Sequence, residues 1–175
     1  MRPMIRRLLA VPALLFAAVA LSACSSGGSS SPSSSSTPTS SSSGSVPAVA
    51  NATDLKVAPV ISPGTGTPPT HLITKDLVVG TGAEAKATST VEVQYVGTIY
   101  GTGTVFDSSW KRGQPATFPL DQVIPGFTQA ITGMKVGGRR IVVIPPALGY
   151  GAQGSPPAIG PNATLVFVID LLAVQ

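Results

Sequence analysis

The most constraining feature of this 175-residue chain is one short helix-like segment among strand-like segments. Apolar residues recur there at helical spacing, on one face of about two turns. A Pro-Gly pair precedes the segment and a Gly follows it, the asymmetry expected of a helix start and end. Because two helical turns are unstable alone in water, we expect a sheet to cover this face. The apolar residues are Phe127, Ala130, Ile131 and Met134.

The rest of the C-terminal half alternates strand-like runs with turns. Residues 90–97 alternate apolar and polar side chains with period two, and residues 139–144 and 163–174 are the longest apolar runs. The connections are of hairpin length, which favours antiparallel pairing. We therefore expect an α+β fold with a mostly antiparallel sheet of five or six strands and one short helix. The remaining predicted strands are residues 72–79, 105–107 and 116–120.

Composition and charge exclude several classes of protein. Only 10% of residues are charged, and 19 Gly and 17 Pro indicate many turns. Three of the eleven basic residues are Arg2, Arg6 and Arg7, and the remaining eight nearly balance the seven acidic residues. No basic stripe with interleaved aromatics is visible, so we expect no nucleic-acid partner. With one Cys and one His the chain cannot form an internal disulfide, and we expect no metal and no cofactor.

The N-terminus has the three parts of a secretory signal: three arginines, an apolar run over residues 8–21, and small residues. The run is shorter than the roughly 20 residues that span a bilayer. Residues 21–24 (LSAC) resemble the lipobox of bacterial lipoproteins. The resemblance implies that residues 1–23 are removed and that Cys24 is acylated, for example with palmitate, which would anchor an exported protein in the bacterial cell envelope. The alternative is a general secretory signal cut nearby, with Cys24 discarded or free.

Between this signal and the strands lie two further predicted regions. Residues 24–50 comprise the acylated Cys and a Ser-rich tether with too little apolar surface to fold. Residues 51–70 form a transitional segment, in which 55–61 is a candidate edge strand interrupted by Pro59. We place the folded domain at residues 71–175, with a start anywhere between about 53 and 70 consistent with the pattern.

Seven short segments of this domain occur in an order that identifies a family. They closely resemble the FKBP-type peptidyl-prolyl cis-trans isomerases, the tacrolimus-binding family. The resemblance implies a twisted antiparallel sheet wrapped around one short helix, and a monomeric enzyme acting on Pro-containing, unfolded or partly folded polypeptides. Tacrolimus-like macrolides are the further ligands that it implies. The segments are residues 93–97 (VQYVG), 106–109 (FDSS), 118–120 (FPL), 122–127 (QVIPGF), 133–138 (GMKVGG), 147–151 (ALGYG) and 163–167 (ATLVF).

The same resemblance implies the residues of a pocket. Phe127 would form its floor beneath the proline ring, while the Ile124 backbone N–H and the Tyr150 hydroxyl would meet substrate carbonyls. The Asp107 carboxylate would lie at the edge, beside the Tyr95 ring. Val123 and Ile159 would bind substrate. The full predicted set is Tyr95, Phe106, Asp107, Val123, Ile124, Phe127, Tyr150, Ile159 and Phe167.

Such a pocket needs no nucleophile, because amide resonance is what slows rotation about an Xaa–Pro bond. Each residue also has a simpler interpretation. Asp107, which precedes two serines, could simply be a turn-forming residue. Taken singly, Phe106, Phe127 and Phe167 would be aromatic residues of the core. Their register within the resembling segments favours the pocket.

The chain departs from the family pattern at three positions. Ala116 stands where many members carry a pocket aromatic, Ser155 where some carry a His, and Phe127 where Trp is common at the floor. These changes leave a second hypothesis open, a non-catalytic module or chaperone that binds proline peptides with the same fold. A hydrolase is disfavoured, because His71 is the only His in this sequence and the sequence contains no nucleophile-elbow motif.

Overall fold

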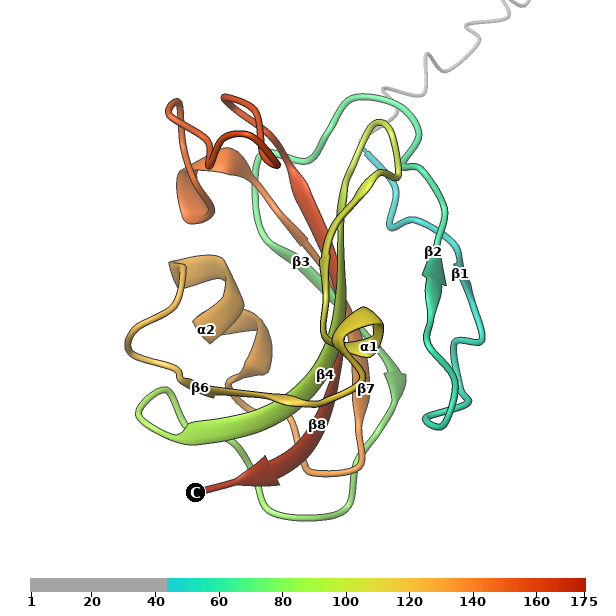
Figure 1. Cartoon of the computed structure of the whole chain (residues 1–175), viewed down its shortest axis with the longest axis vertical. Coiled ribbons are helices and arrows are strands. Elements are labelled where there is room, and N and C mark those ends of the chain that lie inside the picture. Colours follow the sequence, from blue (N-terminus) through green and yellow to red (C-terminus); the bar gives the residue numbers. More distant parts are fainter. Residues whose placement is uncertain (1–43) are drawn as a thin grey trace, which may run out of the picture. The chain divides into compact units, whose positions relative to one another are not determined.

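The computed structural model describes residues 44–175. The predicted signal peptide, Cys24 and most of the predicted tether lie outside the described residues. The described part is built on one antiparallel six-stranded sheet with the order β3-β7-β8-β4-β5, and β6 pairs with the first half of β4 (Figure 1). The strands are β3 (Ile73–Val78), β4 (Thr90–Ile99), β5 (Val105–Ser108), β6 (Ala116–Pro119), β7 (Arg139–Ile144) and β8 (Leu165–Val174).

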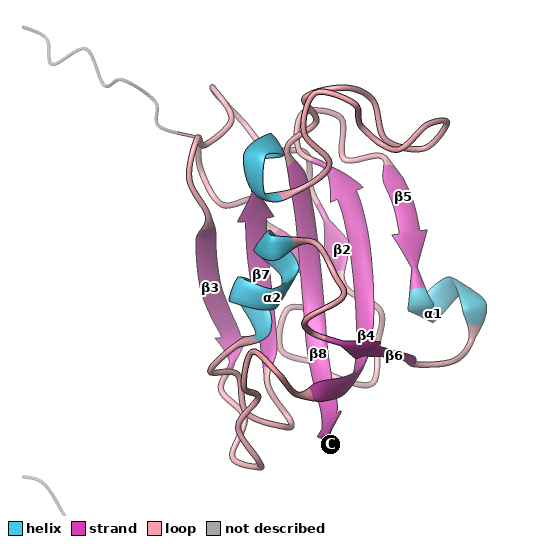
Figure 2. Cartoon of the chain, turned by 90° about the vertical axis from the view of Figure 1, so that its left-hand side faces the viewer, coloured by secondary structure: helices cyan, strands magenta, loops and turns pink. Residues whose placement is uncertain are grey.

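Helix α2 (Pro125–Ile131) covers one face of this sheet (Figure 2). Pro125 occupies its first turn, so the helix begins two residues before the predicted start at Phe127. Phe127, Ala130 and Ile131 are buried against apolar side chains of β4, β7 and β8. The Thr128 hydroxyl donates to the Leu120 carbonyl at 2.5 Å, which ties the helix to the end of β6. The predicted class, an antiparallel sheet around a short helix, is confirmed.

Two single helical turns are additional to the prediction. Helix α1 (Ser109–Arg112) follows β5 directly, and the Ser108 hydroxyl accepts from the Lys111 N–H as its N-cap. Gly113 ends α1 in the left-handed region at φ 74°, which glycine adopts at no steric cost. The 3₁₀ turn η1 (Pro146–Leu148) follows β7.

Residues 44–70, which we call the strap, cover the opposite face of the sheet. Two short strands, β1 (Val49–Ala50) and β2 (Val60–Ile61), form an antiparallel hairpin on the side away from α2 (Figure 1). Of the candidate edge strand 55–61, only the last two residues are a strand, and they belong to this separate hairpin rather than to the main sheet. Ile61 is buried in a second apolar cluster whose members come from the sheet: Val96, Tyr100, Ile141, Val143, Val166 and Val168.

Two polar side chains of the sheet fix the strap. The buried Arg139 guanidinium donates to both oxygens of Asp170, at 2.5 and 2.6 Å, and to the backbone carbonyls of Asn51 and Val57. Burial raises the pKa of Asp170, and the paired Arg139 opposes that rise. The Tyr100 hydroxyl lies 2.8 Å from the Thr65 carbonyl oxygen. Packing therefore extends through the predicted transitional segment to residue 44, at the end of the predicted tether. Within residues 44–175 no helix is long and apolar enough to cross a membrane.

Candidate functional site

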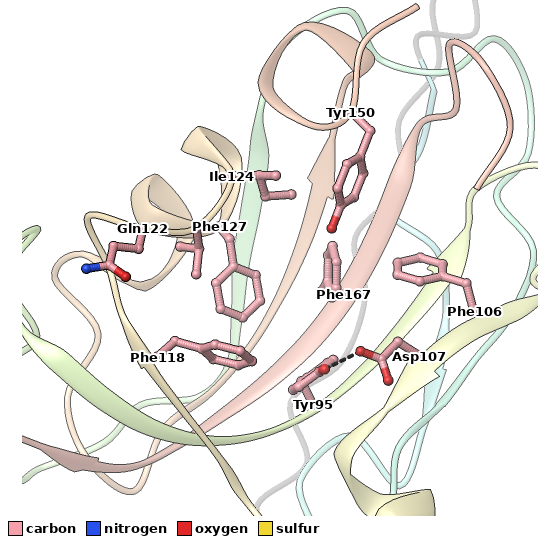
Figure 3. Close-up of a pocket in the computed structure, with 10 residues that line it drawn as sticks. Tyr95, Phe106, Asp107, Phe118, Gln122, Ile124, Phe127, Tyr150 and Phe167 are labelled. Atoms are coloured by element: carbon pink, nitrogen blue, oxygen red, sulfur yellow. Dashed lines mark hydrogen bonds between the residues drawn. The ribbon is translucent and has the colours of Figure 1, made fainter. Parts of the chain in front are cut away.

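A pocket of about 400 Å³ lies between α2 and the sheet, on the face away from the strap. Figure 3 shows aromatic side chains from several elements directed at this common space. Tyr95 comes from β4, Phe106 from β5, Phe127 from α2 and Phe167 from β8. The lining residues are Tyr95, Phe106, Asp107, Phe118, Gln122, Val123, Ile124, Phe127, Tyr150 and Phe167.

The aromatic rings form a connected box. Phe127 and Phe167 pack edge to face with centroids 5.4 Å apart, and Phe106 meets Phe167 at 5.4 Å and 88°. Phe118 lies 5.9 Å from both the Tyr95 and the Phe127 centroids. Edge-to-face pairs are the favoured arrangement, each worth about 0.5–1.5 kcal/mol beyond the area that they bury. The walls are therefore both apolar and rigid.

A glycine in β4 permits this close packing. Gly97 lies opposite Phe167 in the β4–β8 register. A Cβ atom at Gly97 would come within 2.7 Å of the Phe106 ring and 2.8 Å of the Phe167 ring. Any other residue would thus displace one of these rings.

The polar edge of the pocket is a three-residue network. The Tyr95 hydroxyl donates to Asp107 Oδ2, and Arg112 Nη1 donates to Asp107 Oδ1. Arg112 Nη2 also donates to the Tyr95 hydroxyl at 2.9 Å, and its guanidinium lies 5.5 Å from the Tyr95 ring centroid. The Ser108 backbone N–H adds a 2.7 Å bond to Asp107. Asp107 is thereby held as an oriented carboxylate at the pocket rim.

This environment sets the protonation state of the phenol. Burial, and then the hydrogen bond to Asp107, raises the pKa of Tyr95 to about 12, with Arg112 opposing the rise. The pKa of Arg112 is raised as well, first by its hydrogen bond to Tyr95. At neutral pH Tyr95 is therefore a neutral donor and Arg112 a cation.

Two further elements close the pocket. The segment between β6 and α2 carries Val123 and Ile124, and no described residue accepts a hydrogen bond from the Ile124 backbone N–H. Tyr150 follows η1, is 39% exposed, and points its hydroxyl toward the pocket (Figure 3). A donor from the helix start and a hydroxyl from the opposite loop thus face the same space.

The structure brings together eight of the nine predicted lining residues. The exception is Ile159, which is 4% exposed within the main core and does not line the pocket. The prediction lacked Phe118 and Gln122 as lining residues, and it lacked Arg112, which bonds Tyr95 and Asp107 at the pocket rim. Phe118 lay within a resembling segment and shares a face of β6 with Ala116, which was a usable signal.

Other chemistries have little support at this site. His71 is exposed and precedes β3, outside the pocket. Within residues 44–175 no three His, Cys, Asp or Glu side chains gather as a metal site would require. The arrangement provides instead an aromatic space with hydrogen-bond donors and the Asp107 carboxylate at its rim.

Comparison with known proteins matches this geometry. The family model of FKBP-type peptidyl-prolyl cis-trans isomerase matches residues 82–172. A probable FK506-binding protein of Corynebacterium glutamicum is 49% identical over 115 residues, which cover 66% of this chain and 97% of the relative. The outer membrane protein MIP of Legionella longbeachae is 45% identical over 113 residues, covering 65% of this chain and 48% of the relative.

Solved structures agree in fold. The crystal structure of FkpA from Escherichia coli superposes with a TM-score of 0.56 at 45% identity, covering 61% of this chain and 49% of that chain. The crystal structure of AtFKBP13 gives a TM-score of 0.56 at 36% identity, covering 62% of this chain and 96% of that chain. This chain belongs to the FKBP-type peptidyl-prolyl cis-trans isomerase family.

Proposed function

We propose that the aromatic pocket catalyses cis–trans isomerisation of Xaa–Pro bonds in unfolded or partly folded proteins of the bacterial cell envelope. The observation that carries this proposal is the convergence of Tyr95, Phe127 and Phe167 on one apolar space with neutral donors at its rim. A proline ring fits such a space by shape and polarity, and the rim donors can orient the flanking carbonyls.

The chemistry follows from the electronic structure of the amide. The planar amide carries charge separation that water solvates, and rotation by about 90° removes much of it. A water-excluding pocket therefore destabilises the planar substrate relative to the twisted state, which is differential binding of the transition state. A thousand-fold acceleration needs only about 4 kcal/mol. No covalent step or acid–base pair is required.

The residues divide this work between them. Phe127 lies at the base of the box and would contact the proline ring, flanked by Tyr95 and Phe167. The Ile124 N–H, which has no partner among residues 44–175, and the Tyr150 hydroxyl would each donate to a substrate carbonyl and favour the twisted geometry. Asp107, held by Tyr95 and Arg112, would fix the rim on the other side. These donors contribute only if the pocket stays dry, because in water they would exchange one hydrogen bond for another.

Activity on a short peptide tests the proposal. The chain should accelerate exchange in a Leu-Pro tetrapeptide, measured by exchange NMR. Tyr150→Phe should lower kcat/KM by up to about tenfold, since one hydrogen bond contributes roughly 0.5–1.5 kcal/mol. Tyr100→Phe is the matched control, because Tyr100 lies on the strap side of the sheet. A peptide that binds without acceleration would contradict catalysis and favour the non-catalytic binding module or chaperone.

The same pocket suits a macrolide that presents a pipecolyl or prolyl-like ring. Its volume of about 400 Å³ lies within the usual range of small-molecule sites. We propose that tacrolimus competes with the peptide, with Ala116 and Phe127 lowering affinity because they offer less aromatic contact area. Competition by tacrolimus in the exchange assay, and stronger competition after Ala116→Phe, would support this.

Envelope localisation rests on the N-terminal sequence and on relatives. The LSAC segment ending at Cys24 fits a lipoprotein signal, and one relative is named an outer membrane protein. We propose that Cys24 is the acylated first residue of the mature protein, that the part of residues 24–50 preceding the strap tethers the domain to a membrane, and that the domain acts as a monomer. Mass spectrometry of the mature N-terminus tests the anchor, and an unmodified Cys24 or a different cleavage site would contradict it.

A further inference from the structure

A second groove lies on the strap side of the sheet. It has a volume of about 370 Å³ and runs between β2 of the strap and the corner where β5 meets α1. Val60 and Ile61 form one wall and Val105 and Trp110 the other, with Val96 of β4 between them. We call this the strap groove. β2 of the strap packs on Val96 of β4, and the groove lies beside this contact, toward β5 and α1.

Apolar side chains, which folded proteins usually bury, are exposed to solvent at the strap groove. Val60 is 60% exposed and Val105 is 37% exposed, and both line the groove. Val57, 43% exposed, precedes its first lining residue, Ala58. Exposed apolar side chains that line a hollow are more typical of a binding site than apolar side chains scattered over a surface.

Within the described part of the chain, some backbone and side-chain groups at the groove also lack hydrogen-bond partners. In the β1–β2 ladder, the Ser62 N–H donates to the Ala48 carbonyl. Alternation along an antiparallel pair therefore turns the N–H and C=O of Ile61 away from β1, toward the open edge of β2. The Trp110 indole N–H is buried and finds no acceptor among the described residues. An extended peptide carries the backbone groups that the free edge of β2 would need.

The groove and the proposed catalytic pocket lie on opposite faces of the sheet but share two elements, β5 and α1. On β5, Phe106 and Asp107 line the pocket, whereas Val105 and Ser108 line the groove. On α1, Arg112 holds the pocket rim, whereas Trp110 and Lys111 line the groove. Because β5 is the edge strand of the sheet, an extended chain can pass around it from one site to the other.

We propose that the strap groove binds an extended, apolar, non-basic segment of the same unfolded polypeptide whose Xaa–Pro bond occupies the pocket. The inference rests on the proposed isomerase function for its biological role. The segment would lie along the free edge of β2 and place alternate side chains among Val60, Val96 and Val105. Lys111 at the groove disfavours basic segments. The groove would hold a client while prolines pass through the pocket.

Trp110 permits a direct test, because it is the only Trp in the chain. The probe is an acetylated and amidated octapeptide of alternating Val and Thr with terminal Gln, which contains no Pro or Trp. We expect it to shift the fluorescence of Trp110 saturably and to leave tetrapeptide isomerisation unchanged. An octapeptide of alternating Lys and Thr should cause no shift. Absence of any Trp110 response to the Val–Thr peptide would overturn the proposal, whatever the isomerase assay shows.

A matched pair of variants tests the role in client handling. Val60→Glu should lower the affinity of the protein for the octapeptide by at least about tenfold, because binding would bury an unpaired carboxylate. It should also slow catalysed refolding of a proline-limited unfolded protein several-fold without changing tetrapeptide kcat/KM. Val79→Glu is the control, since Val79 is 75% exposed at a distance from the groove. Equal effects of the two variants would overturn the proposal.

The competing occupant is a second copy of the chain. Light scattering distinguishes it: a dimer that Val60→Glu dissociates and Val79→Glu does not would assign the groove to self-association and overturn the client proposal. A complete lack of tetrapeptide activity together with an intact Trp110 response would contradict the isomerase function and leave the groove assignment standing.

Discussion

Arg112 connects two residues that the sequence resemblance placed at the pocket, although it was not itself predicted. It donates to both Asp107 and the Tyr95 hydroxyl, and lies over the Tyr95 ring. The side chain is 42% exposed, so the ion pair adds little to stability. Arg112 instead orients its two partners, because its hydrogen bonds fix the Tyr95 hydroxyl and the Asp107 carboxylate relative to each other. Arg112 is therefore a positioning residue.

The titration of Tyr95 reports on this network. Its pKa of about 12 lies above the value of 10.0 for a free phenol. The associated stability is therefore fully present below pH 10 and is lost as the pH rises toward 12. Arg112→Gln should raise the pKa of Tyr95 further, whereas Asp107→Asn should lower it, because the two partners act with opposite sign.

Phenolate absorbance, taken as the difference from a Tyr95→Phe variant, measures both shifts. Lys111→Gln is the control, since Lys111 neighbours Arg112 in α1 but bonds neither Tyr95 nor Asp107 in the described structure. Shifts of the same sign in the Arg112 and Asp107 variants would contradict the assigned network. Folding at high pH is checked by circular dichroism.

At the scale of elements, β4 organises the molecule. Its first half pairs with β6 and its second half with β5, while β8 pairs along nearly its whole length. One strand thus positions Tyr95 on the pocket side and Val96 on the strap side. Gly97 then lets the rings from β5 and β8 meet above it.

Replacing this glycine should harm the pocket more than the fold. We expect Gly97→Ala to displace the Phe106 or Phe167 ring, to destabilise the domain by about 1–3 kcal/mol, and to lower kcat/KM about tenfold. Gly101→Ala is the matched control, because a Cβ there would meet nothing within 4 Å. That variant should change stability by less than about 0.5 kcal/mol.

Urea titration and the tetrapeptide assay provide the two measurements for both glycine variants. If Gly97→Ala and Gly101→Ala had the same activity, catalysis would not depend on the present positions of the Phe106 and Phe167 rings.

At the scale of the molecule, the sheet separates two apolar layers. One contains α2 and the pocket, and the other lies beneath the strap. The second layer is fixed by Arg139, which is buried together with Asp170 and bonds strap carbonyls more than 80 residues away. The strap therefore folds as part of the domain.

Loss of this arginine should be costly. Arg139→Met leaves Asp170 buried without its partner, which we expect to lower the free energy of unfolding by about 3–5 kcal/mol. Arg140→Met is the control on the same strand, because Arg140 pairs with the partly exposed Asp76 and its loss should cost about 1 kcal/mol. Denaturant midpoints compare the two, and equal losses would contradict the assigned role of Arg139.

Local patterns of the sequence determined most of the sheet and the helix. Period-two alternation located β4, apolar runs located β7 and β8, and the flanking Pro and Gly located α2. These signals are reliable because each concerns side chains that are neighbours along the chain. The resembling segments then supplied the pocket residues, and eight of nine line one cavity.

Only the tertiary structure decided the features that depend on distant partners. The strap has two-residue strands and no periodicity, and its place is set by Arg139 and Tyr100 from the sheet. Ile159 lies in the main core and outside the lining of the described pocket, and an isolated bridge joins it to Ser155. Arg112 reaches the pocket because a single capped turn redirects the chain after β5. Short-range patterns determine which elements form, whereas the contacts that join them depend on folding the whole chain.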